Sequence, residues 1–314
     1  MMKMNLEKKS KFVMSEISGF VNIDKPVDWT SHDVVAKLRR VLGTKKVGHA
    51  GTLDPFATGV LPIAVGSATR LIRFLKKSKK YLAEIDLSKK TDTDDYTGEV
   101  IEVNDSEITE EEFKEKLSAM LGELDQIPPL YSAKKINGKK LYELMRAGHD
   151  LDLSEIKPKK VLIKEIKIIS FAYPLASFEV SCGEGTYIRS IARDCGGHLT
   201  KLRRLESNGF SLESSIRFED LEDGDLKPEE LMLNMKDYLD LPSLSFERKE
   251  VIFLQQGRQL YLEEPESELL SRLSDSNSDE KYVMCLDSSK ELIGLVKIHK
   301  KKGGELELQP KVIL

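Results

Sequence analysis

The stretch from Gly48 to Gly59, GHAGTLDPFATG, constrains this chain more than any other part of its sequence. It places one carboxylate, Asp54, in a segment whose three glycines allow tight or left-handed backbone. Pro55 favours extended backbone at Asp54 and keeps that residue out of a helix interior. The apolar, partly β-branched residues 60–65 that follow predict a buried strand, which anchors the segment.

Two interpretations of Asp54 remain open from local chemistry alone. An Asp followed by Pro in a glycine-rich stretch is typical of a structural turn in which the carboxylate binds its own backbone. The same residues also hold a carboxylate on a loop from which it can be aimed at a ligand. Turn propensities explain both equally well.

Length and composition restrict the class of protein. A chain of 314 residues with 40% hydrophobic residues predicts two domains with adequate cores. No apolar stretch is long enough for a membrane span, and the lysine-rich start lacks the apolar region of a signal peptide. The three cysteines, Cys182, Cys195 and Cys285, suit neither a zinc site nor a disulfide framework, so we expect reduced thiols and a cytoplasmic protein.

The net charge of −4 is unusual for an RNA-binding protein, so the distribution of charge matters more than the sum. Each basic cluster alone is typical of a solvated helix face, but three flank the candidate site motifs and favour a phosphate-binding face. The clusters are Lys37, Arg39, Arg40, Lys45 and Lys46; Arg70, Arg73, Lys76, Lys77, Lys79 and Lys80; and Lys134, Lys135, Lys139, Lys140 and Arg146.

Hydrophobic periodicity and capping signals predict alternating strands and helices up to about residue 218. We expect strands at 20–23, 60–65 and 81–88, helices after Thr30 or Ser31, at 71–75 and after Thr109, a hairpin from 161–171 and 177–182, and a turn, strand and helix over 185–191. An acidic stretch over 219–245 precedes four candidate strands at 251–254, 282–286, 292–298 and 305–308.

Seven ordered blocks resemble the TruB family of tRNA pseudouridine synthases, from about residue 19 to residue 210. The central one is Gly48–Pro55, which is similar to the GHTGTLDP signature of that family. The others are Asn22–Pro26, Lys80–Tyr81, Thr91–Asp94, Gln126–Lys135, Gly185–Ser190 and Leu202–Arg204.

The resemblance implies an α+β fold, in which helices flank a central mixed or antiparallel sheet and a small β-rich PUA-like domain follows. We expect a flexible lead over 1–18, a catalytic domain over 19–245 with an RNA-clamping insertion at about 125–155, and the PUA-like domain over 246–314.

The resemblance also implies roles for individual residues. Asp54 is the expected nucleophile, Arg189 its countercharge and Tyr81 the residue that stacks on the base or takes part in the proton step. A buried carboxylate needs such a countercharge, and a guanidinium can bind it through two nitrogens. The expected substrate-binding residues are His49, Lys25, Lys134, Tyr187 and Leu202.

The implied activity is isomerisation of uridine 55 in the T loop of tRNA, after the nucleotide is extruded from the RNA. The product is an isomer, so no metal or cofactor is expected. We also expect a monomer that uses no guide RNA and binds no membrane. Whether the carboxylate attacks C1′, attacks C6 or assists a glycal route stays open.

Two features depart from the family pattern: Ala50 replaces the usual Thr, and the segment Cys195–Lys201 is shorter than usual. The main rival is a non-catalytic RNA-binding protein or chaperone on the same scaffold, and a guide-dependent synthase is another. A glycosidase-like hydrolase needs a second carboxylate, which the Asp54 loop lacks. The sequence near Gly43 also lacks the GxxxxGK[ST] pattern of a nucleotide-binding loop.

Overall fold

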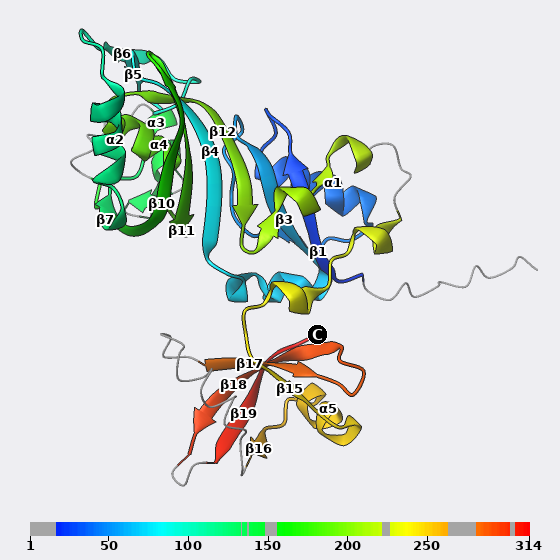
Figure 1. Cartoon of the computed structure of the whole chain (residues 1–314). Helices are drawn as coiled ribbons and strands as arrows, with labels where there is room; N and C mark the ends of the chain where they lie inside the picture. The colour runs from blue at the N-terminus through cyan, green and yellow to red at the C-terminus, as the bar shows by residue number, and fades with distance from the viewer. Residues whose placement is uncertain are drawn as a thin grey trace, which may run out of the picture.

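The structure is a computed structural model, and it describes residues 17–132, 134–136, 138–147, 156–221, 227–262, 281–301 and 305–314. These residues form a ten-stranded sheet in the N-terminal part and a separate five-stranded sheet in the C-terminal part (Figure 1). The expected lead over 1–18 lies outside the described residues except for its last two.

The N-terminal sheet is mixed but mostly antiparallel. Its strands are β1 (Gly19–Lys25), β2 (Val47–His49), β3 (Thr58–Val65), β4 (Ser78–Asp86), β7 (Gly122–Gln126), β10 (Lys159–Ala172), β11 (Leu175–Gly183), β12 (His198–Ser207), β13 (Phe210–Ser211) and β14 (Ile216–Arg217). Eight follow the order β14-β1-β3-β12-β4-β11-β10-β7, while β2 pairs with β3 and β13 with β12. The pairs β1–β14 and β3–β12 are parallel.

Three helices pack on one face of this sheet. They are α1 (Ser31–Val41), α2 (Glu110–Ser118) and α4 (Ile188–Cys195). The predicted caps are present, because Thr30 and Thr109 each form a capping box with the residue three positions later. The buried sides of the helices and alternate strand residues, such as Leu38 and Ile63, share one core.

The opposite face of β1 and β3 is also buried. Phe20, Val60 and Ala64 point away from the helices and join a second core with Phe210 and Leu71. This explains why residues 60–65 are apolar without a break: the strand is covered on both sides. Two short 3₁₀ helices, η1 (Gly66–Arg70) and η2 (Ile72–Phe74), replace the helix expected at 71–75.

Smaller elements complete the N-terminal part. They are the hairpin β5 (Lys89–Thr91) and β6 (Val100–Val103), the hairpin β8 (Lys135–Ile136) and β9 (Lys139–Lys140), α3 (Leu141–Arg146), and the 3₁₀ helices η4 (Leu212–Ser214), η5 (Glu219–Leu221), η6 (Pro228–Leu231) and η7 (Met235–Tyr238). Residues 125 and 126, at the start of the insertion expected at about 125–155, belong to β7 and pair with β10. Residues 133, 137 and 148–155 of the expected insertion lie outside the described residues.

The C-terminal sheet has the order β15-β17-β18-β19-β16. Its strands are β15 (Ser243–Ser245), β16 (Leu260–Leu262), β17 (Lys281–Leu286), β18 (Leu292–Lys300) and β19 (Leu306–Ile313). The expected strands at 282–286, 292–298 and 305–308 correspond to β17, β18 and β19, and β19 extends further than predicted.

Two predicted strands are wrong. Residues 251–254 lie in a helix, α5 (Arg248–Gln255), because Glu247 and Glu250 form a capping box that starts a helix just before this apolar run. The stretch 185–187 forms no strand; its backbone runs as a loop into the first turn of α4. Short apolar runs are ambiguous between helix and strand when periodicity is the only guide.

The shortened segment after α4 is a connection of two glycines. Gly196 adopts left-handed backbone with φ of 100° and ends the helix. Gly197 lies so close to β4 that a Cβ atom would stand 2.2 Å from the carbonyl oxygen of Asp86. The chain therefore enters β12 at His198 without a longer loop.

Gly59 is required where β3 passes β12. Its φ is +102°, and a Cβ atom would lie 2.2 Å from the backbone oxygen of Arg204. Gly43 provides a comparison: its φ is +61°, but a Cβ atom there meets nothing within 4 Å. A side chain at position 59 is therefore disfavoured both by the positive φ and by lack of space, whereas one at position 43 is disfavoured by the positive φ alone.

We therefore expect Gly59→Ala to destabilise the protein far more than Gly43→Ala. Gly43→Ala, the control, should lose only the cost of placing alanine in left-handed backbone, about 1–2 kcal/mol of unfolding free energy. Gly59→Ala must also displace β12, so we expect a loss of roughly 3 kcal/mol or more. Urea unfolding followed by circular dichroism measures both, and equal losses would contradict this account of the β3–β12 contact.

Candidate active site

Asp54 starts a tight turn at the end of the glycine-rich loop. The amide of Ala57 donates a hydrogen bond to the Asp54 carbonyl at 3.1 Å, and Pro55 occupies the position that Pro favours in such turns. The Asp54 side chain points away from this turn and is 35% exposed. The backbone therefore forms a turn, as the first interpretation expects, but the carboxylate pairs with Arg189 rather than with its own backbone and is presented toward a ligand, as the second expects.

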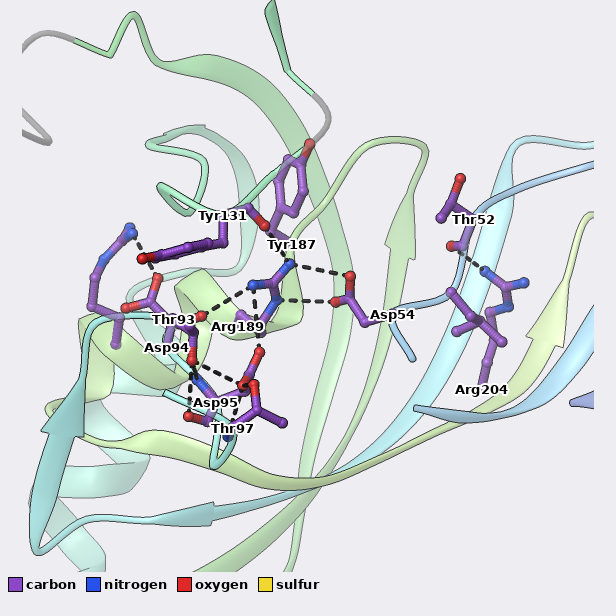
Figure 2. Close-up of polar contacts among 12 residues, drawn as sticks. Thr52, Asp54, Thr93, Asp94, Asp95, Thr97, Tyr131, Tyr187, Arg189 and Arg204 are labelled. Carbon is purple, nitrogen blue, oxygen red and sulfur yellow. Dashed lines mark hydrogen bonds and ion pairs between the residues drawn. The ribbon is translucent and has the colours of Figure 1, made fainter. Parts of the chain in front are cut away.

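A fully buried arginine holds the loop from β12. Arg204 is 0% exposed, and its guanidinium donates to the carbonyl oxygens of Gly51, Thr52 and Val60 at 3.1, 3.2 and 2.7 Å (Figure 2 shows the contact with Thr52). The carbonyl oxygens satisfy the buried guanidinium, and the guanidinium fixes the backbone before and after the turn.

Lys25 and Ser31 hold the other side of the loop. The Lys25 ammonium donates to the carbonyl oxygens of Pro26, Trp29 and Pro55 at 2.7, 2.6 and 3.1 Å. The Leu53 amide donates to the Ser31 hydroxyl at 2.8 Å. Burial lowers the pKa of Lys25 to about 8, and the nearby Asp54 charge opposes that change.

Arg189, in the first turn of α4, binds the Asp54 carboxylate through two nitrogens. Its Nη2 donates to Oδ1 at 3.1 Å, and its Nε lies 3.0 Å from Oδ2 (Figure 2). The Arg189 side chain is only 6% exposed, whereas Asp54 faces open space. The expected ion pair is thus present, and it leaves the outer side of the carboxylate accessible.

The other side of the Arg189 guanidinium is fully occupied. Nη1 donates to the Thr93 carbonyl and Nη2 to the Tyr131 carbonyl, both at 3.0 Å, and Nη1 also lies 3.4 Å from Oδ2 of Asp95. Asp95 is buried, and its Oδ1 accepts hydrogen bonds from Thr93 and Thr97. Arg189 therefore bridges two carboxylates, and the carbonyl oxygens of two other residues, Thr93 and Tyr131, help to fix its orientation (Figure 2).

A second ion pair supports the start of this network. Asp94, with φ of 61°, accepts from Nη1 of Arg193 at 3.2 Å. Burial raises the pKa of Asp94 to about 6, although the Arg193 guanidinium opposes the shift. Gln126 holds the entry to α4, because its side-chain amide exchanges two hydrogen bonds with the backbone of Tyr187.

Asp54 lies in the wall of a cavity of about 1010 Å³. Four of the predicted site residues share this wall with Asp54 and Arg189, namely His49, Tyr81, Tyr187 and Leu202. Other lining residues include Thr52, Phe56, Lys79, Thr93, Asp95 and Tyr131. The cavity thus combines aromatic and apolar surface with one accessible carboxylate, as is typical of a small-molecule or base pocket.

Burial shapes the chemistry of two lining residues. It raises the pKa of the Tyr81 phenol, and the neighbouring Arg204 guanidinium opposes that rise. It also lowers the pKa of His49, as do the charges of Arg204 and His32. At neutral pH Tyr81 is a protonated phenol, which suits stacking and hydrogen-bond donation.

Two of the predicted substrate-binding residues lie elsewhere. Lys25 is 0% exposed beneath the loop, does not line the cavity and donates to three backbone carbonyl oxygens. Lys134 does not line the cavity, and its ammonium donates to the carbonyl of Lys157.

The sequence analysis did not single out three residues of the site: Arg204, Asp95 and Lys79, the last named only within a basic cluster. Arg204 ends the Leu202–Arg204 block and Asp95 directly follows the Thr91–Asp94 block. Both residues thus lie in or beside a motif that could have identified them as site residues. No local pattern marks Lys79 as different from the lysines around it.

Comparison with known proteins assigns the family. The model of the TruB family pseudouridylate synthase N-terminal domain matches residues 39–188. The tRNA pseudouridine synthase B of Microcystis aeruginosa is 48% identical over 213 residues, covering 65% of this chain and 72% of that protein. The Clostridioides difficile protein of the same name is 43% identical over 214 residues, covering 66% and 71%.

The chain belongs to the TruB family of pseudouridine synthases.

A solved structure extends the similarity to the whole fold. In the Cbf5–Nop10–Gar1 complex a chain with 25% sequence identity superimposes with a TM-score of 0.68, covering 94% of this chain and 85% of that chain. The predicted α+β fold with a PUA-like C-terminal unit is thereby confirmed. In the described part of this TruB-family chain, every helix is too short or too polar to cross a bilayer.

The raised pKa of Asp94 generates a pH prediction. The pKa of the Asp94 carboxyl group is 3.8 in the unfolded chain and about 6 in the folded protein. Between these two pH values the folded state therefore binds more protons than the unfolded state. Its contribution to stability therefore falls as the pH rises through this window. Relative to Asp94→Asn, the wild type should lose free energy of unfolding between pH 4 and pH 6 in urea titrations, and a constant difference would contradict the prediction.

Proposed function

We propose that this protein converts the uridine at position 55 in the T loop of tRNA to pseudouridine, acting as a monomer and without guide RNA. The observation that carries the proposal is the Asp54 carboxylate, bound from behind by Arg189 and open to a cavity in a member of a pseudouridine synthase family. The tRNA substrate follows from relatives named tRNA pseudouridine synthase B.

The reaction breaks the bond between N1 of uracil and C1′, turns the base and joins C5 to C1′. The proton lost from C5 is balanced by the proton gained at N1. Asp54 is the proposed nucleophile, and attack at C1′, attack at C6 and a glycal route all use the same exposed carboxylate. Arg189 pairs with that carboxylate and orients it without covering its outer side.

The target uridine must leave the RNA stack to reach Asp54. Tyr81, Tyr187 and Leu202 line the cavity and offer replacement contacts for the extruded base. Because its pKa is raised, the Tyr81 phenol keeps its proton at neutral pH, so it offers a stacking surface and a hydrogen-bond donor rather than a ready base. His49, at the edge of the loop, is proposed to contact the nucleotide.

Sequence similarity favours guide-free recognition. The relatives named tRNA pseudouridine synthase B are 43–48% identical to this chain, against 25% for the Cbf5 chain, whose complex contains Nop10 and Gar1. We propose that the insertion after β7 closes over the T loop and that the C-terminal unit contacts the acceptor end. The cytoplasm, where tRNA is modified, is the proposed location.

The decisive experiment incubates unmodified tRNA transcript with purified protein and no added RNA, then maps pseudouridine. Wild type should convert a single T-loop uridine. Asp54→Asn should lower the rate by at least about 10³-fold yet bind tRNA at least as tightly, because one negative charge near the phosphates is lost.

Asp194→Asn is the matched control, since Asp194 is 41% exposed and pairs with Arg193 away from the cavity. It should convert tRNA at the wild-type rate. Conversion by Asp54→Asn, or none by wild type, would overturn the catalytic proposal, and tRNA binding without any conversion would favour the RNA chaperone.

Asp95 is the proposed positioning residue for Arg189. Asp95→Asn removes the charge that anchors the far side of the guanidinium, so we expect kcat to fall about 10–100-fold with little change in KM. Asp94→Asn is the control, because its carboxylate pairs with Arg193 instead. A larger change in KM than in kcat would contradict a positioning role.

A further inference from the structure

A second cavity, of about 720 Å³, lies where the N-terminal part meets the C-terminal sheet. One side is formed by η1, η2 and the start of β4, and the other by Lys311 and Val312 of β19. Phe74 of η2 packs edge-on against Tyr282 of β17, with ring centroids 4.8 Å apart, and thereby connects the two parts. The junction is a packed one, because the second core also contains residues of both.

The lining of this junction cavity is strongly basic. Arg70, Arg73, Lys77, Lys79 and Lys311 contribute cations, and Glu184 is the one lining carboxylate among the described residues. Glu184 lies 3.5 Å from Lys77, so one cation is already paired. The others give the cavity a net positive charge in a protein whose overall charge is −4.

The junction cavity adjoins the active-site cavity. His49 and Lys79 line both, so these two side chains form the boundary between them. Lys79 precedes Tyr81 by two positions in β4, and residues at this spacing point to the same face of a strand. The lysine therefore sits beside the proposed base-stacking residue.

Lys79 has no ion-pair partner among the described residues, although the charge of nearby Glu184 acts on it. Within the described part of the chain no carboxylate forms an ion pair with Lys79 or with its neighbour Arg204, whose donors bind backbone carbonyl oxygens. The Lys79 ammonium lies 3.5 Å from where a Cβ atom of Gly51 would be. Burial and the Arg204 charge both lower the pKa of Lys79. A bound anion would favour the charged form of this ammonium.

The adjacent lysine shows the contrast. Lys80 points to the opposite face of β4 and forms an ion pair with Glu179 at 2.9 Å. That pair raises the pKa of Lys80. Two consecutive lysines of one strand thus differ in whether a carboxylate pairs with them. Lys80 forms an ion pair with Glu179, whereas Lys79 lies between two cavities without one.

We propose that Lys79 binds an RNA phosphodiester adjacent to the target nucleotide, and that the strand leading from it enters the junction cavity, where Arg70, Arg73 and Lys311 bind further phosphates. This inference rests on the proposed function, because the RNA must place its target base beside Tyr81. Phosphate is the chemistry that the unpaired cations select. A polymer is favoured over a free anion because the basic lining continues from the active-site cavity to β19.

The experiment measures RNA affinity against salt for Lys79→Met, Lys79→Arg and the control Lys80→Met. Loss of one phosphate contact should reduce the slope of log K against log salt by about 0.7–0.9. Lys79→Met should show this reduction and bind several-fold more weakly at low salt. Lys79→Arg should restore the slope, and Lys80→Met should match wild type.

A second measurement uses wild-type protein and T-arm RNA that carries one neutral methylphosphonate linkage, placed in turn on each side of the target uridine. One of these linkages should weaken binding to wild type but cause no further loss with Lys79→Met. Inorganic phosphate at concentrations that leave ionic strength unchanged should not compete with the RNA, and strong competition would show a free-anion site instead.

The proposal is overturned if both neutral linkages weaken Lys79→Met as much as wild type, or if Lys80→Met changes the salt slope as Lys79→Met does. Either result leaves the proposed function intact when wild type still converts the T-loop uridine. Absence of that conversion in wild type contradicts the proposed function itself, whatever the salt slopes.

Discussion

The ion pair between Asp54 and Arg189 is the interaction on which the site depends. It joins a loop that precedes β3 to the first turn of α4, across 135 residues of chain. A guanidinium that is 6% exposed needs acceptors and opposite charge around it, and here two carboxylates and two carbonyls surround it. Of the two carboxylates, Asp95 is 3% exposed, whereas the Asp54 side chain is 35% exposed at the cavity.

Cations also organise the backbone around that carboxylate. Lys25 and Arg204 both lie beneath the glycine-rich loop, fully buried, and donate to its carbonyl oxygens rather than to side chains. This arrangement brings positive charge close to Asp54 without neutralising it by contact.

Local patterns were sufficient where a segment's own residues decide its structure. The alternation around Tyr81 predicted β4, and Thr30 and Thr109 correctly marked the starts of α1 and α2. The apolar run at 251–254 shows the limit, because Glu247 and Glu250 cap it as a helix although its composition suits a strand. Lys25 shows another limit: the motif places a lysine in the sequence, but only the fold shows that its side chain is buried beneath the loop.

The amino-acid sequence by itself determined the family, the strand and helix starts, and the pairing of Asp54 with Arg189 as an expectation, since motif order and capping are written along the chain. Only the tertiary structure decided which cations are structural and which are free. Lys79 and Lys80 are neighbours of one residue type, yet β4 directs them to opposite faces, one toward two cavities and one toward Glu179. Burial and long-range partners set the state of each charge, and those partners come from strands far away in the chain.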